Sequence, residues 1–370
     1  MSTAPSTAST TRPFAQLDPH TVLDALEAIG LQCDGRLQAL NSFENRVYLV
    51  GLESGNGLVA KFYRPGRWSR EQLLEEHQFA HEIAAAEIPL AAPLSRPALQ
   101  RPMDDADDDE DPSPFAGDTL FESHGFHIAL FARQGGRAPE LDHVRHGPAM
   151  RARIGRFIAR IHQVGARRPF RFRPAISCRL DGWDAIERVL SGPWLPPELQ
   201  DDWAHIARLC CEHVEERLHP AGSGDRPFTQ IRLHGDCHLG NLLWTEAHGP
   251  HFVDLDDARM GPAIQDLWMV ADAAGQSPPN EGSDVAASQA MQELLAGYEQ
   301  IRPLDRRELR LIEPLRTLRM IRHSAWLAER WTDPAFPAAF PWFGSHRYWQ
   351  GQIQHLQEQL AQLTHDHDWS

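Results

Sequence analysis

Alternation of apolar and polar residues predicts a run of strands near the start of the chain. Residues 36–39, 46–52 and 58–63 each have this pattern. The turn-rich segment 53–57, Glu-Ser-Gly-Asn-Gly, separates the last two. We therefore expect a small antiparallel sheet in this part of the chain.

Helical periodicity flanks these strands on both sides. Residues 18–30 carry helix start signals at Asp18 and the proline after it, and a glycine as stop signal. Residues 69–86 open with a pair that resembles a capping box, led by Ser69, ahead of a stripe of apolar residues. Both segments are predicted helices.

The remaining chain changes character after one more strand pair. Residues 119–122 and 126–131 are predicted strands, and the Arg-Gln-Gly-Gly sequence at 133–136 predicts a hinge. Beyond it, residues 150–164 place their isoleucines and a phenylalanine on one helical face, and most later segments are helical down to 353–363.

These elements predict an α+β chain with two lobes. A disordered tail over residues 1–13 precedes a small antiparallel-sheet lobe with one packed helix, residues 14–133. A larger, mainly helical lobe covers residues 134–370.

The composition is that of a globular protein, with 42% hydrophobic and 24% charged residues in 370. No apolar run approaches the ~18 residues of a membrane span, and the first residues lack the pattern of an export signal. The five cysteines form no Cys-x-x-Cys pair, which argues against a zinc ribbon or a disulfide framework. We therefore expect a cytoplasmic protein with reduced thiols and no membrane segment.

Charge excludes one class of partner. The formal net charge is -15, and residues 104–111 contribute seven of the carboxylates. This run belongs to a segment of about 101–117 that is expected to be an exposed acidic insertion in the small lobe. No basic stripe is present, so nucleic acid is not an expected partner.

Lysine and arginine are used very unequally. Of the 36 basic residues, Lys61 is the single lysine. A lysine ammonium is a compact point charge, whereas guanidinium is a broad planar fork. The retained lysine therefore indicates a position at which arginine cannot work, although survival by chance is the alternative.

The most specific pattern is His-x-Asp-x-x-x-x-Asn over residues 234–241, followed by an apolar strand that ends in Asp254. Phosphoryl transfer from ATP needs a carboxylate to orient the attacking hydroxyl and accept its proton, a task that suits Asp236. It also needs oxygen ligands for Mg²⁺, which Asn241 and Asp254 can supply. A lysine such as Lys61 can hold the α and β phosphates.

Two other interpretations of this segment remain open. His-Gly-Asp is also common in turns, and aspartates at strand ends often cap turns or helices. Alternatively His234, Asp236, Cys237 and His238 could form a metal cluster, but no distant Cys/His pair at zinc spacing completes it. The whole set in this order favours phosphoryl transfer.

On these motifs the chain resembles the aminoglycoside phosphotransferase and choline kinase superfamily, and within it the bacterial stress response kinase A family. The resemblance covers roughly residues 36–349 and is tightest at these segments: 41–48, 61–65, 75–79, 234–241, 252–259 and 331–337. It implies a two-lobed protein-kinase-like fold and ATP-dependent, Mg²⁺-dependent phosphorylation of serine and threonine in proteins. The expected partners are ATP and a protein substrate, with the chain acting as a monomer.

The resemblance also implies roles for individual residues. Asp236 corresponds to the proton acceptor, Asn241 and Asp254 to the magnesium ligands, and Lys61 to the ATP lysine. Its partner would be Glu76, with Glu75 as the alternative. The segment from Ser42 to Asn45 takes the place of a glycine-rich loop but contains no glycine, so phosphate contact by these two residues is inferred.

Some assignments stay open at this stage. Asp266 is expected to cap a helix or anchor a loop, Asp256 could contact a second metal or cap a turn, and Cys237 could respond to oxidation or simply pack. The rival function is a small-molecule kinase for an amino alcohol or sugar, since no long activation loop fits between Asp254 and Gly261. An aromatic cluster could cage a cationic substrate or fill the core; its members are Trp326, Trp331, Phe336, Phe340, Trp342, Phe343, Tyr348 and Trp349. A catalytically inactive nucleotide-binding module is a third possibility.

Overall fold

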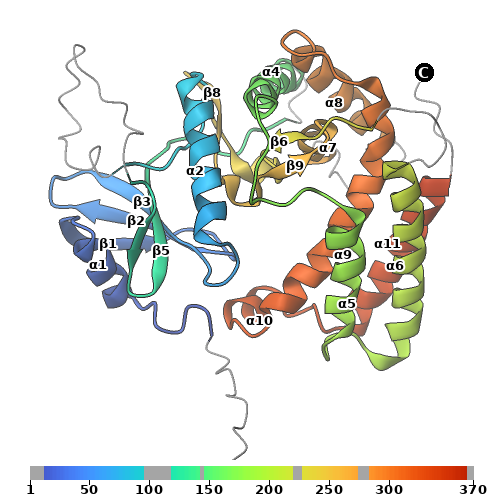
Figure 1. The fold of residues 1–370 in the computed structure, drawn as a ribbon, viewed down its shortest axis with the longest axis horizontal. Helices are drawn as coiled ribbons and strands as arrows, with labels where there is room; N and C mark the ends of the chain where they lie inside the picture. The colour runs from blue at the N-terminus through green and yellow to red at the C-terminus, as the bar shows by residue number, and fades with distance from the viewer. Residues whose placement is uncertain (1–11, 96–117, 142–145, 220–226, 274–282, 365–370) are drawn as a thin grey trace, which may run out of the picture. The chain divides into compact units, whose positions relative to one another are not determined.

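The computed structural model, drawn in Figure 1, describes residues 12–95, 118–141, 146–219, 227–273 and 283–364. The chain divides into two compact units. Unit 1 comprises Met1–Ser69, Leu94–Arg133 and Arg330–Pro341. Unit 2 comprises Arg70–Pro93, Gln134–Glu329 and Trp342–Ser370.

Unit 1 is built on a five-stranded antiparallel sheet of order β1-β2-β3-β5-β4. The strands are β1 (Cys33–Ala39), β2 (Arg46–Leu52), β3 (Gly57–Phe62), β4 (Phe121–Ser123) and β5 (Phe126–Ala132). Helix α1 (Pro19–Ala28) packs on this sheet and begins where the Asp18 carboxylate accepts a hydrogen bond from Thr21 N. The five predicted strands are therefore confirmed, with shifts of a few residues at their ends.

The central strand of this sheet carries the single lysine. Lys61 lies opposite Val47 of β2 and Ala129 of β5. Its neighbours Ala60 and Phe62 join the buried core between the sheet and α1. Because both sides of β3 are paired, the backbone of Lys61 has little freedom to move.

Unit 2 is mainly helical. Its helices are α2 (Arg70–Ala85), α4 (Gly147–Gly165), α5 (Asp184–Leu190), α6 (Pro197–Leu218), α7 (Ile264–Ala273), α8 (Ser283–Tyr298), α9 (Ile312–Arg330, whose last residue belongs to unit 1) and α11 (His346–Thr364). Two small antiparallel pairs accompany them: β6 (Ile231–Leu233) with β9 (Arg259–Gly261), and β7 (Leu242–Thr245) with β8 (Gly249–Phe252). Figure 1 shows α6 and α11 side by side, in agreement with their contacts.

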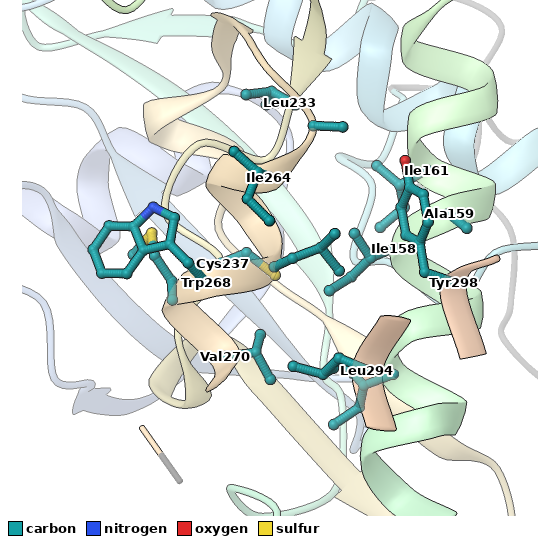
Figure 2. Packing of buried hydrophobic residues seen from close by; sticks show 14 of the residues in the cluster. Ile158, Ala159, Ile161, Leu233, Cys237, Ile264, Trp268, Val270, Leu294 and Tyr298 are labelled. Carbon is teal, nitrogen blue, oxygen red and sulfur yellow. The ribbon is translucent and has the colours of Figure 1, made fainter. Parts of the chain in front are cut away.

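The core of unit 2 holds the small strands against helices. Figure 2 shows Ile158 and Ile161 of α4 close to Leu294 and Tyr298 of α8, with Ile264 of α7 nearby. Helices α4 and α8 pack at glycines, because a Cβ on Gly155 would clash with the carbonyl oxygen of Leu294. This close packing gives the loops attached to β6 and α7 a rigid support.

The division into units differs from the predicted boundaries in two places. The expected break near residue 133 is present, but α2 belongs to unit 2, since Phe79, Ala80 and Ile83 are part of that unit's core. The helix packed on the unit 1 sheet is α1. Residues 330–341, which contain the short helix α10 (Ala335–Ala339), belong to unit 1.

Two predicted segments, the N-terminal tail and the acidic insertion, cannot be compared with the structure. Residues 1–11 of the predicted tail and the whole acidic insertion at 101–117 lie outside the described residues. Among the helices searched in the described residues, none combines the length and the apolar character needed to cross a bilayer.

Candidate active site

The predicted catalytic loop connects β6 to β7. Its second residue, Gly235, has a φ of +84°, and a Cβ there would clash with the carbonyl oxygen of Asp257. Only glycine combines this backbone conformation with so close an approach. The glycine between His234 and Asp236 is therefore required by the backbone geometry of the loop.

Asp266, in the first turn of α7, anchors this loop. Its carboxylate accepts hydrogen bonds from the backbone N of His234 and of Gly235, each at 2.9 Å. The side chain is 1% exposed. Burial alone would raise the pKa of Asp266, but the hydrogen bond from His162 and the backbone bonds lower it, so the group is ionised. The expectation that Asp266 anchors a loop is confirmed.

A buried chain of polar groups continues behind Asp266. His162 Nε2 lies 3.1 Å from the Asp266 carboxylate, and His162 Nδ1 lies 3.0 Å from the Tyr298 hydroxyl. Burial lowers the pKa of His162, so its ring is neutral and has one N–H. An ionised carboxylate only accepts, so Nε2 donates to Asp266 and Nδ1 accepts from Tyr298, whose oxygen accepts from Arg302 Nη1 at 2.9 Å. These bonds hold Asp266 in a single orientation.

Asp236 is held by three side chains. Arg319 Nη1 of α9 donates to Asp236 Oδ1 at 2.6 Å, and His238 Nε2 lies 3.3 Å from Oδ2. Asn241 Nδ2 donates to the backbone oxygen of Asp236 at 2.9 Å. Burial raises the pKa of Asp236, but the hydrogen bond from His238 and the charge of Arg319 outweigh burial and hold the pKa below its usual range. The carboxylate is therefore ionised and able to orient a hydroxyl.

The hairpin β7–β8 brings the two predicted metal ligands together. Leu242 pairs with Phe252, and Val253 N donates to the carbonyl oxygen of Asn241 at 3.0 Å, so Asn241 and Asp254 flank the open end of the hairpin. Asp254 is exposed and has a φ of +63°, a left-handed conformation that is rare outside glycine and concentrated at functional sites. Since the Asn241 amide N–H₂ faces Asp236, its oxygen is available to a metal.

This donor set fits Mg²⁺ better than a transition metal. It consists of one carboxylate and one amide oxygen, and Mg²⁺ in phosphoryl transfer is typically held by one or two such protein ligands together with phosphate oxygens. No group of three His, Cys, Asp or Glu in the described residues could hold a metal ion. The alternative cluster of His234, Asp236, Cys237 and His238 is not formed in the described residues: His234 Nε2 lies 3.0 Å from the Val253 carbonyl oxygen and Cys237 is buried.

Arginines form a second layer around the loop, and the sequence did not indicate them. Arg322, one helical turn after Arg319, donates to Asp257 Oδ1 at 2.7 Å. Arg259 Nη1 donates to Asp181 Oδ1 at 2.9 Å. The only signal in the sequence is the i, i+3 spacing of Arg319 and Arg322, which places them on one face of a helix.

In unit 1, the loop that replaces a glycine-rich loop runs from Ser42 to Asn45. Asn45 is 2% exposed, and its amide oxygen accepts a hydrogen bond from Arg64 N at 3.0 Å. This oxygen therefore holds the loop to the start of the segment after β3, and the phosphate contact inferred for Asn45 stays a prediction. Ser42 is partly exposed and remains a candidate for that contact. Lys61 is buried, with Nζ 4.9 Å from the Tyr63 ring centroid.

The two glutamates of α2 have different surroundings. Glu75 is occupied in unit 2, where its carboxylate accepts hydrogen bonds from the backbone N of Arg171, Phe172 and Arg173 at 2.6–2.9 Å. Glu76 Oε2 accepts from Arg173 Nη2 at 2.7 Å. These contacts favour Glu76 over Glu75 as the partner of Lys61, and that pairing stays a prediction because the two residues belong to different units.

A cavity of about 510 Å³ lies in unit 2 beside Asp236. Both Arg319 and His238, the side-chain partners of the Asp236 carboxylate, line it. Its other walls come from α7, α9 and α11: Trp268, Met269, Asp272, Arg316, Met320, His323, Gln352, His355, Glu358 and Gln359. Burial and the nearby Arg319 lower the pKa of His323 to about 4, so its ring is neutral at pH 7.

Three of the aromatic residues that could have formed a cation cage, Phe336, Phe343 and Trp349, are buried, whereas Trp342 is 41% exposed. Phe336 and Phe340 pack on Phe43 in unit 1. In unit 2, Trp349 packs edge-to-face on Trp203 at 5.5 Å, and Phe343 packs on Trp194. Core packing is therefore confirmed for Phe336, Phe343 and Trp349.

Burial bears on two further residues. Cys237 is buried in the core of unit 2 (Figure 2), which raises the pKa of its thiol and makes oxidation there unfavourable. Asp256 is buried as well, and its backbone oxygen accepts from Arg173 Nη1 at 2.7 Å. The choice between a second-metal contact and a turn cap for its carboxylate stays open.

Known proteins match this chain over the segments that contain these motifs. The sequence profile of the phosphotransferase enzyme family matches residues 36–304. The chain is also 39% identical over 350 residues to stress response kinase A of Salmonella choleraesuis (strain SC-B67), covering 95% of this chain and 94% of that protein. The chain belongs to the stress response kinase A family of phosphotransferases.

Another member of this family, the serine/threonine protein kinase RdoA of Salmonella typhimurium, is 39% identical with the same coverage, and stress response kinase A of Escherichia coli (strain K12) is 37% identical over 355 residues. The phosphotransferase is thus a kinase enzyme.

Solved structures share its fold. An amicoumacin kinase, hAmiN, in complex with AMP-PNP, Ca²⁺ and amicoumacin superimposes with a TM-score of 0.67, covering 94% of each chain at 18% identity. A microcompartment-associated aminopropanol kinase gives a TM-score of 0.62 at 16% identity, covering 92% of this chain and 96% of that one. At these identities the comparison establishes the two-lobed α+β kinase-like fold of this phosphotransferase.

Proposed function

We propose that this kinase transfers the γ-phosphoryl group of ATP to serine or threonine hydroxyls of a protein, with Mg²⁺ as its metal cofactor. The observation that carries the proposal is the setting of Asp236. Its ionised carboxylate stands on a rigidly anchored loop, and the two side chains bonded to that carboxylate line a cavity large enough for an acceptor. Orientation of this kind supplies most of the catalysis in phosphoryl transfer.

In this proposal each residue has one task. Asp236 orients the acceptor hydroxyl and takes its proton as the new O–P bond forms and the bond from the γ-phosphorus to ADP breaks. Asn241 and Asp254 would hold Mg²⁺, which neutralises phosphate charge when bound. Lys61, held by Glu76, would bind the α and β phosphates, and Ser42 would contact phosphate from its loop.

The acceptor class rests on two considerations. The relative RdoA, at 39% identity, is named a serine/threonine protein kinase. The cavity is also poorly suited to the cationic acceptors of an amino alcohol kinase. The Arg316 guanidinium lies 5.6 Å from the Trp268 ring centroid, so a cation of the protein itself already occupies that aromatic face.

The alternative is a small-molecule kinase, which the names of the structural neighbours favour. The amicoumacin and aminopropanol kinases share the fold at 16–18% identity only. A catalytically inactive module is disfavoured because every expected catalytic position is filled. We further propose that the kinase acts in the cytoplasm, since its described cysteines are free thiols, as is typical of a reducing compartment. Its monomeric state stays a prediction.

The test is transfer from γ-labelled ATP in the presence of Mg²⁺, with generic protein substrates in one arm and a panel of hydroxyl-bearing small molecules in the other. We expect label on serine or threonine of protein, and transfer lower on the order of 10²-fold or more with Asp236→Asn. Label on small molecules alone would establish the alternative. Nucleotide binding without transfer to either kind of acceptor would support the alternative of a catalytically inactive module.

A further inference from the structure

The loop from Ser42 to Asn45 is tied to a segment almost 300 residues further along the chain. This segment, residues 330–341, is called the strap here, and both belong to unit 1. Asp333 of the strap accepts hydrogen bonds from Arg46 Nη2 at 2.9 and 3.0 Å and from Arg64 Nη2 at 2.8 Å. Arg330 Nε donates to the Glu44 carboxylate at 2.6 Å. Phe43 packs on Phe340 with ring centroids 5.0 Å apart.

The two arginines that bind Asp333 also bind the backbone of the loop. Arg46 Nη1 donates to the carbonyl oxygens of Phe43 and Asn45, each at 3.2 Å. Arg64 donates to the carbonyl oxygens of Phe43 at 3.2 Å and Glu44 at 2.9 Å. Three successive carbonyl groups of the loop are thus bonded to guanidinium groups whose positions depend on one carboxylate.

This arrangement favours an anion at the loop. Among the ion pairs described here, four guanidinium groups, of Arg46, Arg64, Arg67 and Arg330, meet two carboxylates, of Glu44 and Asp333, so positive charges outnumber negative ones in this set. The carbonyl groups are satisfied by arginine. Within the described residues, the backbone N–H groups of Ser42 and Phe43 have no hydrogen-bond acceptor. Successive N–H groups of this kind form anion-binding sites.

Asp333 has the burial expected of a group that organises the cluster. It is 3% exposed. Burial raises the pKa of Asp333, but the hydrogen bond from Arg64, the backbone bond from Ala335 N and the charge of Arg46 lower it, so it is ionised. A buried carboxylate between two guanidinium groups allows them to approach each other and fixes the direction in which their N–H groups point.

We infer that the strap is a positioning element for the triphosphate of ATP, with Asp333 as the positioning residue and the loop 42–45 as the group that contacts phosphate. This inference rests on the proposed function. The backbone of a glycine-rich loop can adjust to approach phosphates closely. This glycine-free loop is instead fixed by Arg46 and Arg64, which bond both its carbonyl groups and Asp333 of the strap. The strap therefore contributes to binding of phosphate and not to binding of the adenosine part.

The test compares ATP with adenosine in binding to the full-length protein by calorimetry. Asp333→Asn should weaken ATP binding on the order of tenfold, the value of one charge-assisted hydrogen bond, and leave adenosine binding unchanged. The direction is diagnostic. Removing a negative charge makes the cluster more positive, so a purely electrostatic role would tighten ATP binding, whereas a positioning role weakens it.

A second variant guards against failure of the first to fold. Arg46→Lys keeps the charge but offers one nitrogen in place of the two that bond the loop carbonyl groups and Asp333 from separate positions. It should therefore also weaken binding of ATP without weakening binding of adenosine. Asp34→Asn is the matched control. Asp34 is another carboxylate of unit 1 that binds an arginine, since Arg36 Nε donates to it at 2.7 Å. This variant should bind both ATP and adenosine as the wild type does. At saturating ATP, kcat of Asp333→Asn should stay within a few-fold of wild type while KM for ATP rises.

Each outcome separates this inference from the proposed function. Unchanged or tighter ATP binding by both folded variants, or equal losses for ATP and adenosine, overturns the role of the strap while wild-type transfer still supports the kinase. Failure of the wild-type protein to bind ATP overturns both.

Discussion

Replacing Asp266 by asparagine tests whether catalysis depends on the anchor of the catalytic loop. The carboxylate accepts three hydrogen bonds, from His234 N, Gly235 N and His162 Nε2. The first and third go to Oδ2 and the second to Oδ1. An asparagine that keeps its oxygen at the Oδ2 position retains two of them, but its amide N–H₂ then faces the Gly235 N–H.

The magnitude follows from this count. One buried backbone donor is left without an acceptor, which costs roughly 1–3 kcal/mol, and the two retained bonds lose their charge assistance. We therefore expect the free energy of unfolding to fall by about 2–4 kcal/mol, or roughly 5–15 °C in Tm for a unit of this size. Displacement of Gly235 moves Asp236, and an error of about 1 Å at a reacting group can lower kcat on the order of 10²-fold.

Stability against pH gives an independent signature. The pKa of Asp266 is lowered in the folded protein, so the group binds protons more readily when unfolded. Its contribution is fully present above the unfolded pKa of about 3.9 and is lost as the pH falls through the lower folded pKa. The difference in Tm between wild type and Asp266→Asn should therefore be constant near pH 7 and narrow in acid below about pH 4.

The assays are thermal unfolding across pH and labelled-ATP turnover, with Asp202→Asn on the exposed face of α6 as the matched control. A variant that keeps the wild-type Tm and kcat would refute the anchoring role. A stability loss that stays constant down to pH 2 would show that the carboxylate charge is not its source.

Three further predictions concern the site itself. Lys61→Arg should keep the charge but lower turnover at limiting ATP, since a planar guanidinium cannot occupy the position of a compact ammonium group. Near-normal turnover at limiting ATP would exclude phosphate anchoring by Lys61. Asp236→Asn should retain Mg-ATP binding and lower transfer on the order of 10²-fold or more, whereas Asp254→Asn should weaken the metal-dependent part of nucleotide binding; titrations of ATP with and without Mg²⁺ that show identical losses in both variants would contradict this division of roles. Arg319→Gln removes a charge that lowers the pKa of Asp236. The acid limb of kcat/KM, below which Asp236 is protonated, should therefore move to higher pH; an unmoved limb would mean that Asp236 is not the group that titrates.

Local patterns were sufficient for much of the fold. The strands β1, β2 and β3 and the helices α1 and α2 were predicted within a few residues, because side-chain periodicity and end signals lie within the elements themselves. The catalytic loop was predicted for the same reason. Asp236 and Asn241 stand five residues apart, and Asp254 ends the next predicted strand, so one hairpin brings them together.

Choices between neighbouring residues needed the tertiary structure. Glu75 and Glu76 are adjacent on one helix, and only the backbone of residues 171–173, packed against α2, shows that Glu75 is occupied. Asn45 likewise has the same polar side chain whether it faces a phosphate or Arg64 N. Sequence specifies the chemistry of a side chain, whereas its partner depends on which segment packs beside it.

Long-range contacts account for what the sequence alone did not reveal. The sequence by itself determined most of the elements and singled out the residues of the predicted catalytic motif and Lys61. Tertiary structure decided that Arg319 binds Asp236 across 83 residues and that Arg46 binds Asp333 across 287. It also decided that α2 packs into unit 2 and the strap into unit 1. Arginine and aspartate are common on surfaces and have no periodicity that marks a partner, so such pairs become recognisable only when folding brings distant segments into contact.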